Sequence, residues 1–446
     1  MAYHLFIFFF GEQSLKALIL AAGNGTRIKS VPPKVLLPLC GVPLIQRTIL
    51  TLKDAGITDI IIIVGFKEDV VKNYLGDGSK YGVKISYATN DEYERENGTS
   101  ILKAEKIVNE KFLLVMGDHI FTPKVIKGIL RVKGDLVIAT DSNPRYIDVG
   151  EATKILKEAD EIKDIGKDLT EFNAVDTGIF LCSKQIFPVI TQCVKDGKEE
   201  WSDSIKKYIE NHKAVSYDAS AAFWLDVDTK EDLKKAETLL LESLTKPGDG
   251  YISRNLNRKI STKILKHLVK TGITPNQLTV ISFMIALISA TSFSFGGYIY
   301  VAVGGVSAQL ASILDGCDGE IARLKFLHTS YGSWLDACLD RYADFLIILG
   351  MIYGYWIIHK EVLIWLIGFI CLAGTFMISY SSTRYKEAFS KNFNSQRISM
   401  SRDLRLFIIF LGGISNQILP SLILLAVLTN LEALMILIQH RKDSKN

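Results

Sequence analysis

The sequence lacks the features that support a disulfide framework, a zinc site or a general affinity for nucleic acid. Its 446 residues include six cysteines, and no two of them stand in a CxxC pair, which argues against a cysteine-based site and favours a reducing, cytoplasmic environment. The formal net charge is only +4, so nucleic acid binding has no general electrostatic support. The first ten residues form an apolar run without a basic n-region or a clear cleavage site. We interpret them as an N-terminal extension or a misassigned start and not as a signal peptide.

Formal charge is also missing from one long stretch, Thr271 to Leu314. Residues before about 245 instead mix charged residues with short apolar runs, as a soluble α/β domain does. Pro and Gly at residues 246–250 favour a break between the two parts. We therefore predict one domain at residues 1–245, a linker with a basic juxtamembrane helix at 246–271, and a membrane domain at 272–446. The helix is expected at 254–270, where six basic residues alternate with Ile and Leu; it is either amphipathic at the membrane surface or an ordinary solvated helix.

The first part alternates strand-like and helix-like segments. Runs rich in Val, Ile and Leu occur at Lys16–Leu20, Ile60–Val64, Phe112–Met116 and Leu136–Ala139. Helical patterns lie between them, for example at Leu44–Ala55 and Ser100–Val108. This order predicts an α/β, Rossmann-like domain with a mostly parallel sheet that helices cover on both faces.

The second part predicts an all-α domain of six transmembrane helices. They are expected near 276–297, 299–321, 334–358, 361–385, 403–417 and 419–439. The loops at 297–299 and 413–419 contain no Lys or Arg, whereas the opposite side is rich in both. The positive-inside rule then predicts a multi-pass protein of the cell membrane with both termini and the soluble domain in the cytoplasm.

Four aspartates directly follow the uncharged stretch, and each would cost about 2.5 to 3.5 kcal/mol at the centre of a membrane helix. Asp315 and Asp318 are three residues apart, and Asp336 and Asp340 are four apart, so each pair lies on one face of its helix. Two such pairs form a set of oxygen ligands suited to Mg²⁺ or Mn²⁺ and to phosphates held by these ions. Polar residues of a helix bundle, paired with basic neighbours, are the alternative interpretation.

The segment from Asp315 to Asp340 resembles the CDP-alcohol phosphotransferases. It reads Asp-x-x-Asp-Gly-x-x-Ala-Arg, then eight residues, then Gly-x-x-x-Asp-x-x-x-Asp, and it fills all eight positions of that family's signature. The resemblance implies transfer of an alcohol phosphate from a CDP-alcohol to an acceptor hydroxyl, with release of CMP. It also implies that Asp315, Asp318 and Asp336 bind metal. Asp340 is expected to be the general base and is counted among the metal ligands as well.

Further residues of this domain are candidates for substrate binding. Gly319 and Gly332 have no side chain and so allow a phosphate or a helix to approach closely, and Arg323 offers a fork of donors to a phosphate oxygen. Arg402 and Arg405 supply positive charge for a phosphate on the acceptor, or they are simply positive-inside residues.

A glycine-rich turn follows the first predicted strand. It comprises Ala22, Gly23, Asn24, Gly25 and Thr26, whose backbone amides can bind phosphates. Arg27 and Lys34, a few residues further on, add positive charge opposite a triphosphate.

The run LAAGNGTR followed by PPKVLLPLCGVPLI resembles the start of sugar-phosphate nucleotidyltransferases, and later segments occur in that family's order. The resemblance implies attack of a phosphate monoester on the α-phosphorus of a nucleoside triphosphate, with Arg27 and Lys34 stabilising the transition-state charge. It assigns the metal, Mg²⁺ or Mn²⁺, to Asp118 and to Asp226 or Asp228. The alcohol-phosphate pocket is assigned to Asp176, Thr177 and Gly178, and base recognition to the segment around Asn97. A domain that binds nucleotide without catalysis is the alternative.

The two halves together resemble the bifunctional archaeal and bacterial enzymes that combine inositol-1-phosphate cytidylyltransferase with di-myo-inositol phosphate phosphate synthase. The resemblance implies that CTP and inositol 1-phosphate give CDP-inositol, which then reacts with a second inositol 1-phosphate to make a phosphorylated compatible solute. The expected partners are these three small molecules and the lipid bilayer, and no nucleic acid. A homodimer through the membrane domain is left open. The alternatives are a phospholipid-forming transferase and a membrane-anchored nucleotide sensor.

Overall fold

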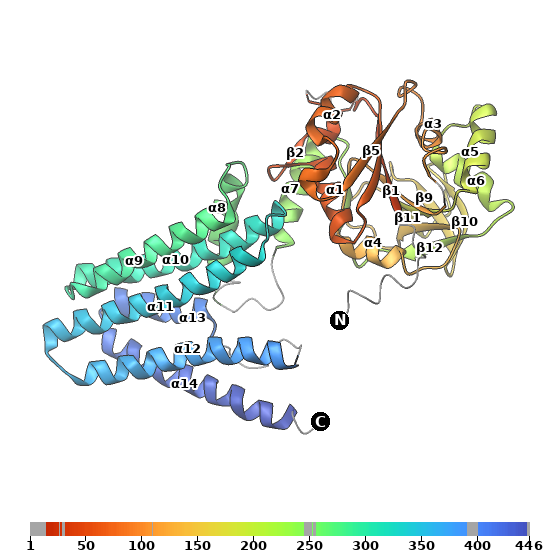
Figure 1. Ribbon diagram of the computed structural model, residues 1–446. Helices are drawn as coiled ribbons and strands as arrows, with labels where there is room; N and C mark the ends of the chain where they lie inside the picture. Colours follow the sequence, from red (N-terminus) through yellow and green to blue (C-terminus); the bar gives the residue numbers. More distant parts are fainter. Residues whose placement is uncertain are drawn as a thin grey trace. The chain divides into compact units, whose positions relative to one another are not determined.

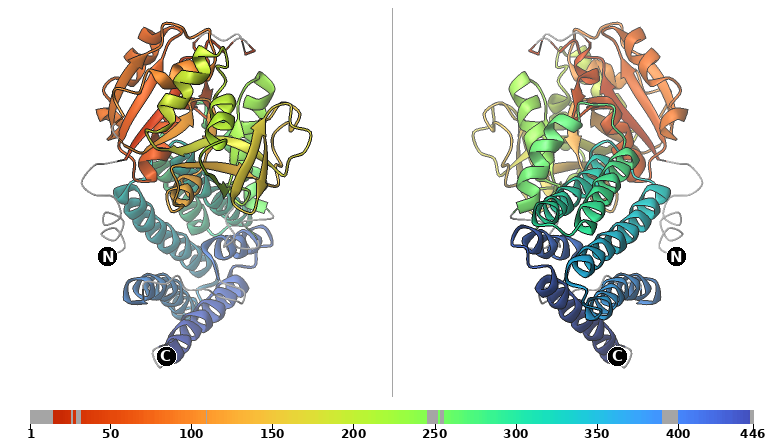
Figure 2. Two further views of the ribbon diagram at one scale, coloured as in Figure 1. Left: turned by 90° about the vertical axis from the view of Figure 1, so that its right-hand side faces the viewer. Right: turned by 90° about the vertical axis from the view of Figure 1, so that its left-hand side faces the viewer.

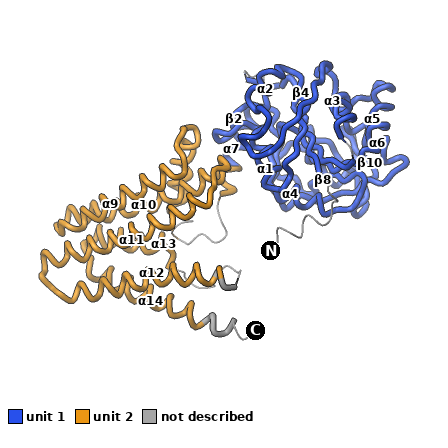
Figure 3. The backbone as a smooth tube through the Cα atoms, in the orientation of Figure 1, with its two compact units in different colours: residues 1–239 blue, residues 240–446 orange. Residues whose placement is uncertain are grey.

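The structure is a computed structural model that describes residues 15–25, 27–28, 32–108, 110–244, 252, 256–389 and 400–443. The apolar N-terminal run, Thr26, the predicted break at 246–250 and Arg254 lie outside the described residues. The chain divides into two compact units, residues 1–239 and 240–446 (Figure 3). The predicted domain boundaries at 245 and 271 stay predictions.

Unit 1 is built around a nine-stranded sheet of order β5-β4-β1-β6-β11-β8-β12-β10-β9, with two small two-stranded sheets, β13-β7 and β2-β3. The strands are β1 (Lys16–Ala21), β2 (Pro38–Leu39), β3 (Val42–Pro43), β4 (Asp59–Val64), β5 (Lys84–Thr89), β6 (Phe112–Met116), β7 (His119–Phe121), β8 (Leu136–Asp141), β9 (Lys154–Glu158), β10 (Glu161–Gly166), β11 (Ala174–Cys182), β12 (Ala214–Asp218) and β13 (Trp224–Asp226). The helices are η1 (Lys34–Leu36), α1 (Leu44–Asp54), α2 (Glu68–Leu75), η2 (Ser79–Tyr81), α3 (Asn97–Leu102), α4 (Pro123–Ile129), α5 (Ile186–Lys195), α6 (Trp201–Ile209) and α7 (Lys230–Glu242).

Helices cover both faces of this sheet, as predicted (Figure 1). Alternate residues of β1 point to opposite faces. Ala17 and Ile19 belong to a core cluster with residues of α1, α2 and α4. Leu18 and Leu20 belong to a second cluster with residues of α3, α5 and α6. Burial on both faces explains why β1 is a continuous apolar run, and it fixes the position of the glycine-rich turn at its carboxyl end.

The sheet is parallel over β5, β4, β1 and β6 and mixed beyond them. Strand β11 is antiparallel to both β6 and β8, and β9 pairs with β10 as an antiparallel hairpin. The predicted parallel strands are therefore correct for one half of the sheet. The other half contains strands that the sequence did not indicate, because β9 and β10 are rich in Lys, Glu and Asp and do not form apolar runs.

One predicted helix of unit 1 is misplaced. The sequence pattern predicted a helix over residues 100–108, but α3 starts at Asn97 and ends at Leu102. Beyond Leu102 the backbone closes tight turns instead, in which the Glu105 amide donates a hydrogen bond to the Leu102 carbonyl oxygen and the Ile107 amide to that of Ala104. Ile101, Ala104 and Val108 are all buried, so the apolar spacing is met by successive turns and not by a continuous helix.

Unit 2 is entirely helical in its described part. Its helices are α8 (Arg258–Leu268), α9 (Pro275–Ser294), α10 (Tyr298–Leu324), α11 (Ser330–His359), α12 (Leu363–Phe389), α13 (Arg402–Ile414) and α14 (Ile418–Asp443). Helices α10 and α11 both pack against α9, α13 packs against α10, and α12 lies beside α14 (Figure 2). Helix α8, the predicted basic helix, buries Ser261 and Leu265 towards the bundle and leaves Lys259, Lys263 and Lys266 exposed.

The six helices expected to span the membrane are all present as α9 to α14. Five of them are long and apolar enough to cross a bilayer by length and composition. The exception is α13, which has 13 residues and is therefore about 20 Å long, shorter than the roughly 30 Å of a hydrocarbon core. Its first turn is charged, which ends the apolar pattern early.

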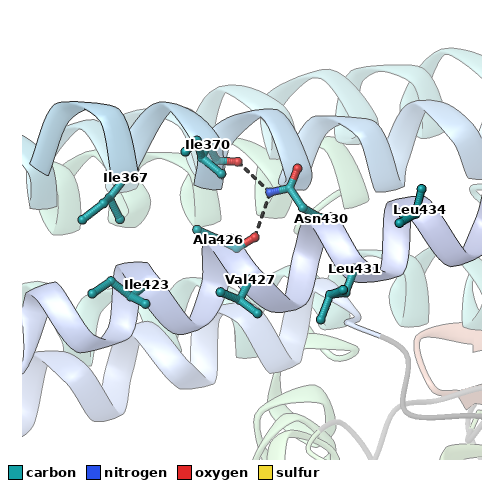
Figure 4. Close-up of a pocket in the computed structure, with 8 residues that line it drawn as sticks. All are labelled: Ile367, Ile370, Ile423, Ala426, Val427, Asn430, Leu431 and Leu434. Atoms are coloured by element: carbon teal, nitrogen blue, oxygen red, sulfur yellow. Dashed lines mark hydrogen bonds between the residues drawn. The ribbon is translucent and has the colours of Figure 1, made fainter. Parts of the chain in front are cut away.

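The apolar helices α12 and α14 enclose a groove (Figure 4). Its lining residues are Ile367, Ile370, Ile423, Ala426, Val427, Asn430, Leu431 and Leu434. Asn430 Nδ2 donates to the carbonyl oxygens of Ile370 and Ala426, at 2.9 and 2.8 Å, which satisfies the amide donors. Because this lining is apolar except for Asn430 and carries no formal charge, it is poorly suited to a divalent metal ion or a phosphate.

Candidate active sites

Three of the four signature aspartates converge in unit 2. The short connection after α10 turns the chain back into α11 at Ser330, so the end of α10 and the start of α11 face each other. Asp315 and Asp318 of α10 and Asp336 of α11 each have a carboxylate oxygen within 4.8 Å of the others. The predicted pairing of these positions is therefore present, and three oxygen ligands are close enough to share a cation.

Local sequence fixes the orientation of this cluster. Helix α9 starts with a capping box, in which Thr274 accepts from the Gln277 amide and Gln277 Oε1 accepts from the Thr274 amide. One turn later, Thr279 Oγ1 donates to Asp318 Oδ2 at 2.5 Å. The amide of Gly319 donates to the other oxygen of Asp318. Asp336 Oδ1 is buried and accepts no hydrogen bond, which leaves that oxygen available to a cation.

The fourth aspartate, Asp340, is held by an arginine. Arg402 Nη1 lies 2.6 Å from Asp340 Oδ1 and 2.7 Å from Asp315 Oδ2. Arg402 Nε lies 3.2 Å from Asp344 Oδ1, and Arg405 Nη2 lies 3.0 Å from Asp344 Oδ2. Asp340 thus lies beside the three-carboxylate group and is not one of its members.

The predicted substrate residues of unit 2 lie around this group with different surroundings. A Cβ on Gly332 would be 2.9 Å from Asn276 Oδ1 and 3.1 Å from Thr329 Oγ1. The Gly332 amide donates a hydrogen bond to Thr329 Oγ1. A Cβ on Gly319 would meet only Arg323 Nη1, at 3.5 Å, so these two residues are neighbours. Arg405 is 5 % exposed and bonds to Asp344, so its position is inside the bundle and not at an open surface.

In unit 1 the glycine-rich turn brings Lys34 against the end of β1. Gly25 has φ +60°, and a Cβ there would be 2.8 Å from Lys34 Cβ, so only glycine permits this approach. Lys34 Nζ lies 2.6 Å from Asp118 Oδ2 and 2.5 Å from Asp228 Oδ1. Arg27 Nη1 lies 2.7 Å from Asp228 Oδ2 and 3.3 Å from Glu151. The two cations and two of the predicted acidic residues therefore form one cluster.

A small antiparallel ladder brings the acidic residues together. Strand β7 pairs with β13 so that His119 is opposite Asp226. One oxygen or nitrogen of each of Asp118, His119 and Asp226 lies within 4.8 Å of the others, and Asp226 Oδ1 is buried without a hydrogen bond. Asp228, two residues on, instead contacts the two cations. Of the two predicted alternatives, Asp226 is thus the one beside Asp118.

The charges of this cluster are strongly coupled. Burial alone would lower the pKa of Lys34, but the carboxylates of Asp118, Asp226 and Asp228 outweigh it and raise the pKa above its ordinary value. Burial would likewise lower the pKa of His119, yet Asp226 and Asp118 raise it to about 9. Burial raises the pKa of Asp226 to about 6, although His119 opposes this. The site is thus dense in negative charge, which favours cations.

The remaining predicted residues of unit 1 have different surroundings. Asp176 Oδ1 accepts from the Gly178 amide at 2.8 Å, and Gly178, at φ +73°, leaves room for the His119 ring, so both border the cluster. Thr177 is fully buried and donates to the Ala139 carbonyl oxygen, which is a bond within the sheet core. Asn97 starts α3 and is exposed. Ala22, Gly23 and Asn24 follow β1, and Thr26 lies outside the described residues.

Sequence reasoning missed His119, Asp344 and Thr279, which contact predicted residues. His119 directly follows Asp118, and Asp344 follows Asp340 by one helical turn, so spacing alone offered a signal for both. Thr279 offered none, because its contact with Asp318 depends on how α9 packs against α10.

Unit 1 contains a glycine-rich turn beside an acidic cluster, and unit 2 contains carboxylates inside a bundle of apolar helices. These features define a nucleotidyltransferase domain followed by a CDP-alcohol phosphotransferase membrane domain. Family profiles agree: residues 17–215 match "MobA-like NTP transferase domain" and residues 272–438 match "CDP-alcohol phosphatidyltransferase". The chain belongs to the family of bifunctional IPC transferases and DIPP synthases, because relatives of that description match it over nearly its full length.

Two such relatives are from Rubrobacter xylanophilus and Aquifex aeolicus. The first is 34 % identical over 430 residues, covering 95 % of this chain and 96 % of the relative. The second is 36 % identical over 432 residues, covering 94 % and 96 %. A solved structure titled as the inositol-1-phosphate CTP transferase from T. maritima is 24 % identical, covers 52 % of this chain and 98 % of that one, and has a TM-score of 0.47.

Proposed function

We propose that this protein carries out two successive reactions, the first in unit 1 and the second in unit 2. In the first, CTP and inositol 1-phosphate give CDP-inositol and pyrophosphate. In the second, CDP-inositol and another inositol 1-phosphate give a phosphorylated di-inositol phosphodiester and CMP. The observation that carries this proposal is the presence of both clusters on one chain whose full-length relatives are named as bifunctional IPC transferases and DIPP synthases.

In the first reaction, a phosphate oxygen of inositol 1-phosphate attacks the α-phosphorus of CTP, and the bond to pyrophosphate breaks. Lys34 and Arg27 offset the charge on the leaving pyrophosphate and on the transition state. The turn from Ala22 to Thr26 binds the phosphates through its amides. Asp176 and Gly178 border the alcohol-phosphate pocket. Asn97 belongs to the segment that recognises the cytosine base. Positioning and charge compensation carry the rate, because phosphoryl chemistry needs little covalent help from the protein.

In the second reaction, a hydroxyl of the acceptor attacks the phosphorus that carries the donor inositol, and CMP leaves. Asp340 takes the proton of that hydroxyl. Arg402 and Arg323 bind phosphate oxygens by their forked donors. Gly319 leaves room for these phosphates, whereas Gly332 allows Asn276 and Thr329 to approach the backbone. Arg405 contributes through its buried contact with Asp344.

The residues of both clusters fit a divalent cation. Asp336 Oδ1 and Asp226 Oδ1 are buried without hydrogen bonds, and carboxylate oxygens are the ligands that Mg²⁺ and Mn²⁺ prefer. We assign one site to Asp118 and Asp226, with Asp228 and His119 adjacent, and the other to Asp315, Asp318 and Asp336, with Asp340 adjacent. A bound cation would stabilise negative charge on the phosphates.

We further propose the setting of the two reactions. Unit 2 is embedded in the cell membrane, and both termini and unit 1 are cytoplasmic, so that soluble nucleotides reach both clusters. The division at residues 245 and 271 separates the two catalytic domains by a basic helix on the membrane surface. A homodimer through the membrane domain is compatible with this arrangement.

The test is a phosphorus NMR time course with the purified full-length protein in detergent, supplied with CTP, inositol 1-phosphate and Mg²⁺. Signals of pyrophosphate and CDP-inositol are expected first, followed by CMP and a phosphodiester. Absence of CDP-inositol rejects the first step. Product that forms only when phospholipid is added favours a phospholipid-forming transferase instead, which is the second candidate function.

A further inference from the structure

Asp344 is an acidic residue inside the membrane helix α11 that the two reactions do not use. It is 4 % exposed and lies one helical turn beyond Asp340 on the same face. A buried carboxylate is costly unless it is paired and hydrogen-bonded. Both of its oxygens are paired, one with Arg402 and the other with Arg405 of α13.

The two arginines have different surroundings. Arg405 is almost fully buried and, among the residues that the structure describes, forms its ion pair with Asp344. Arg402 continues from Asp344 to the reaction centre, because its Nε contacts Asp344 while its Nη1 lies between Asp315 and Asp340. One guanidinium therefore joins the aspartate outside the signature to two aspartates within it.

This geometry gives Asp344 a purpose beyond charge balance. An arginine side chain has several rotatable bonds, so holding it in one orientation costs rotamer entropy. A contact at Nε sets the plane of the guanidinium and leaves Nη1 directed at the carboxylates of Asp315 and Asp340. A pair between Asp344 and Arg405 alone would balance the buried charge without involving Arg402.

We propose that Asp344 is a positioning residue that aims Arg402 at the phosphates of the second reaction, and that Arg405 holds Asp344 in place. The inference rests on the proposed transfer in unit 2 and extends it to a residue that never touches substrate. The step itself is unchanged: the acceptor hydroxyl attacks phosphorus, its proton goes to Asp340, and CMP leaves.

A double-mutant cycle tests the inference by measuring kcat/KM for CMP release from CDP-inositol and inositol 1-phosphate. The cycle compares the wild type with Asp344→Asn, Arg402→Lys and the double variant. Lysine keeps the charge but lacks the Nε–H that contacts Asp344. Each single change is expected to lower kcat/KM roughly 10- to 100-fold, as for other residues that orient a reacting group, and the double variant should resemble Arg402→Lys alone.

Because Asp344→Asn leaves Arg405 buried without its partner, the cycle is repeated with Arg405→Gln in all four proteins. Glu361→Gln, an exposed acid-to-amide change, is the matched control and should leave CMP release unchanged. Equal thermal unfolding midpoints across the Arg405→Gln set exclude a purely structural cause. If the two single effects multiply in the double variant, Asp344 does not act through Arg402 and the inference is overturned. If the wild type releases no CMP, the proposed second reaction fails instead.

Discussion

Arg402 and Asp340 form an ion pair of 2.6 Å between α13 and α11, although they are far apart in sequence. The pair holds the proposed general base beside the three-carboxylate group. The same contact positions both Asp340, the proposed general base, and Arg402, the proposed phosphate ligand. A change at either residue should therefore impair the second reaction and not the first.

Replacing Asp340 with Asn removes the proposed proton acceptor while keeping the shape of the side chain. CMP release should fall about 10²- to 10⁴-fold, the usual contribution of a general base, whereas pyrophosphate release from CTP should persist. Both products are quantified in the same reaction by chromatography. Undiminished CMP release would remove Asp340 from its proposed role.

Replacing Lys34 with Met should impair the first reaction and leave the second intact. Loss of the cation opposite the leaving pyrophosphate is expected to slow pyrophosphate release about 10²- to 10³-fold, while CMP release from added CDP-inositol continues. Lys163→Met, an exposed lysine that pairs with Glu161, is the control. A Lys34 variant that forms CDP-inositol at the normal rate would contradict the assignment.

Thr279 orients Asp318 through a bond of 2.5 Å, so Thr279→Val should weaken cation binding without removing any ligand. We expect the Mg²⁺ concentration that gives half-maximal CMP release to rise about 10- to 100-fold. The Mg²⁺ dependence of pyrophosphate release is the internal reference and should not change. Chelation by EDTA should stop both reactions, and readdition of Mg²⁺ or Mn²⁺ should restore them.

Gly354 of α11 lies directly against α9, where a Cβ would overlap the carbonyl oxygen of Phe293. Gly354→Ala should therefore force the two helices apart and lower the thermal unfolding midpoint of unit 2 in detergent. Gly316→Ala, where nothing lies within 4 Å of the added Cβ, should leave the midpoint within a degree or two. Equal midpoints for the two variants would show that α9 and α11 tolerate a wider separation.

The sequence predicted the features that depend on local spacing. Asp315 and Asp318 are on one turn of a helix, and so are Asp336 and Asp340, so their shared faces follow from helical geometry alone. The β1 strand and the turn after it were equally predictable, because an apolar run that ends in glycines has few other conformations. The helix ends were less certain, as α3 illustrates.

The sequence could not predict contacts that depend on tertiary packing. Arg402 was expected to bind an acceptor phosphate, but its pairing with Asp315 and Asp340 requires that α13 pack beside α10. The place of His119 opposite Asp226 depends on the register of two short strands, each of three residues. Such pairings are specified by the whole fold and leave no periodic pattern in either segment.

Two of the arginines that neutralise the α11 carboxylates, Arg402 and Arg405, come late in the chain. Arg402 follows Asp340 by 62 residues (402 − 340), which a ribosome adds in roughly 3 to 12 s at about 5–20 residues per second. During biogenesis the hairpin of α10 and α11 is therefore made before Arg402 and Arg405 exist, when Arg341, 3.5 Å from Asp340, is the cation already present on α11. Until translation delivers α13, these carboxylates must stay hydrated or remain at the insertion machinery.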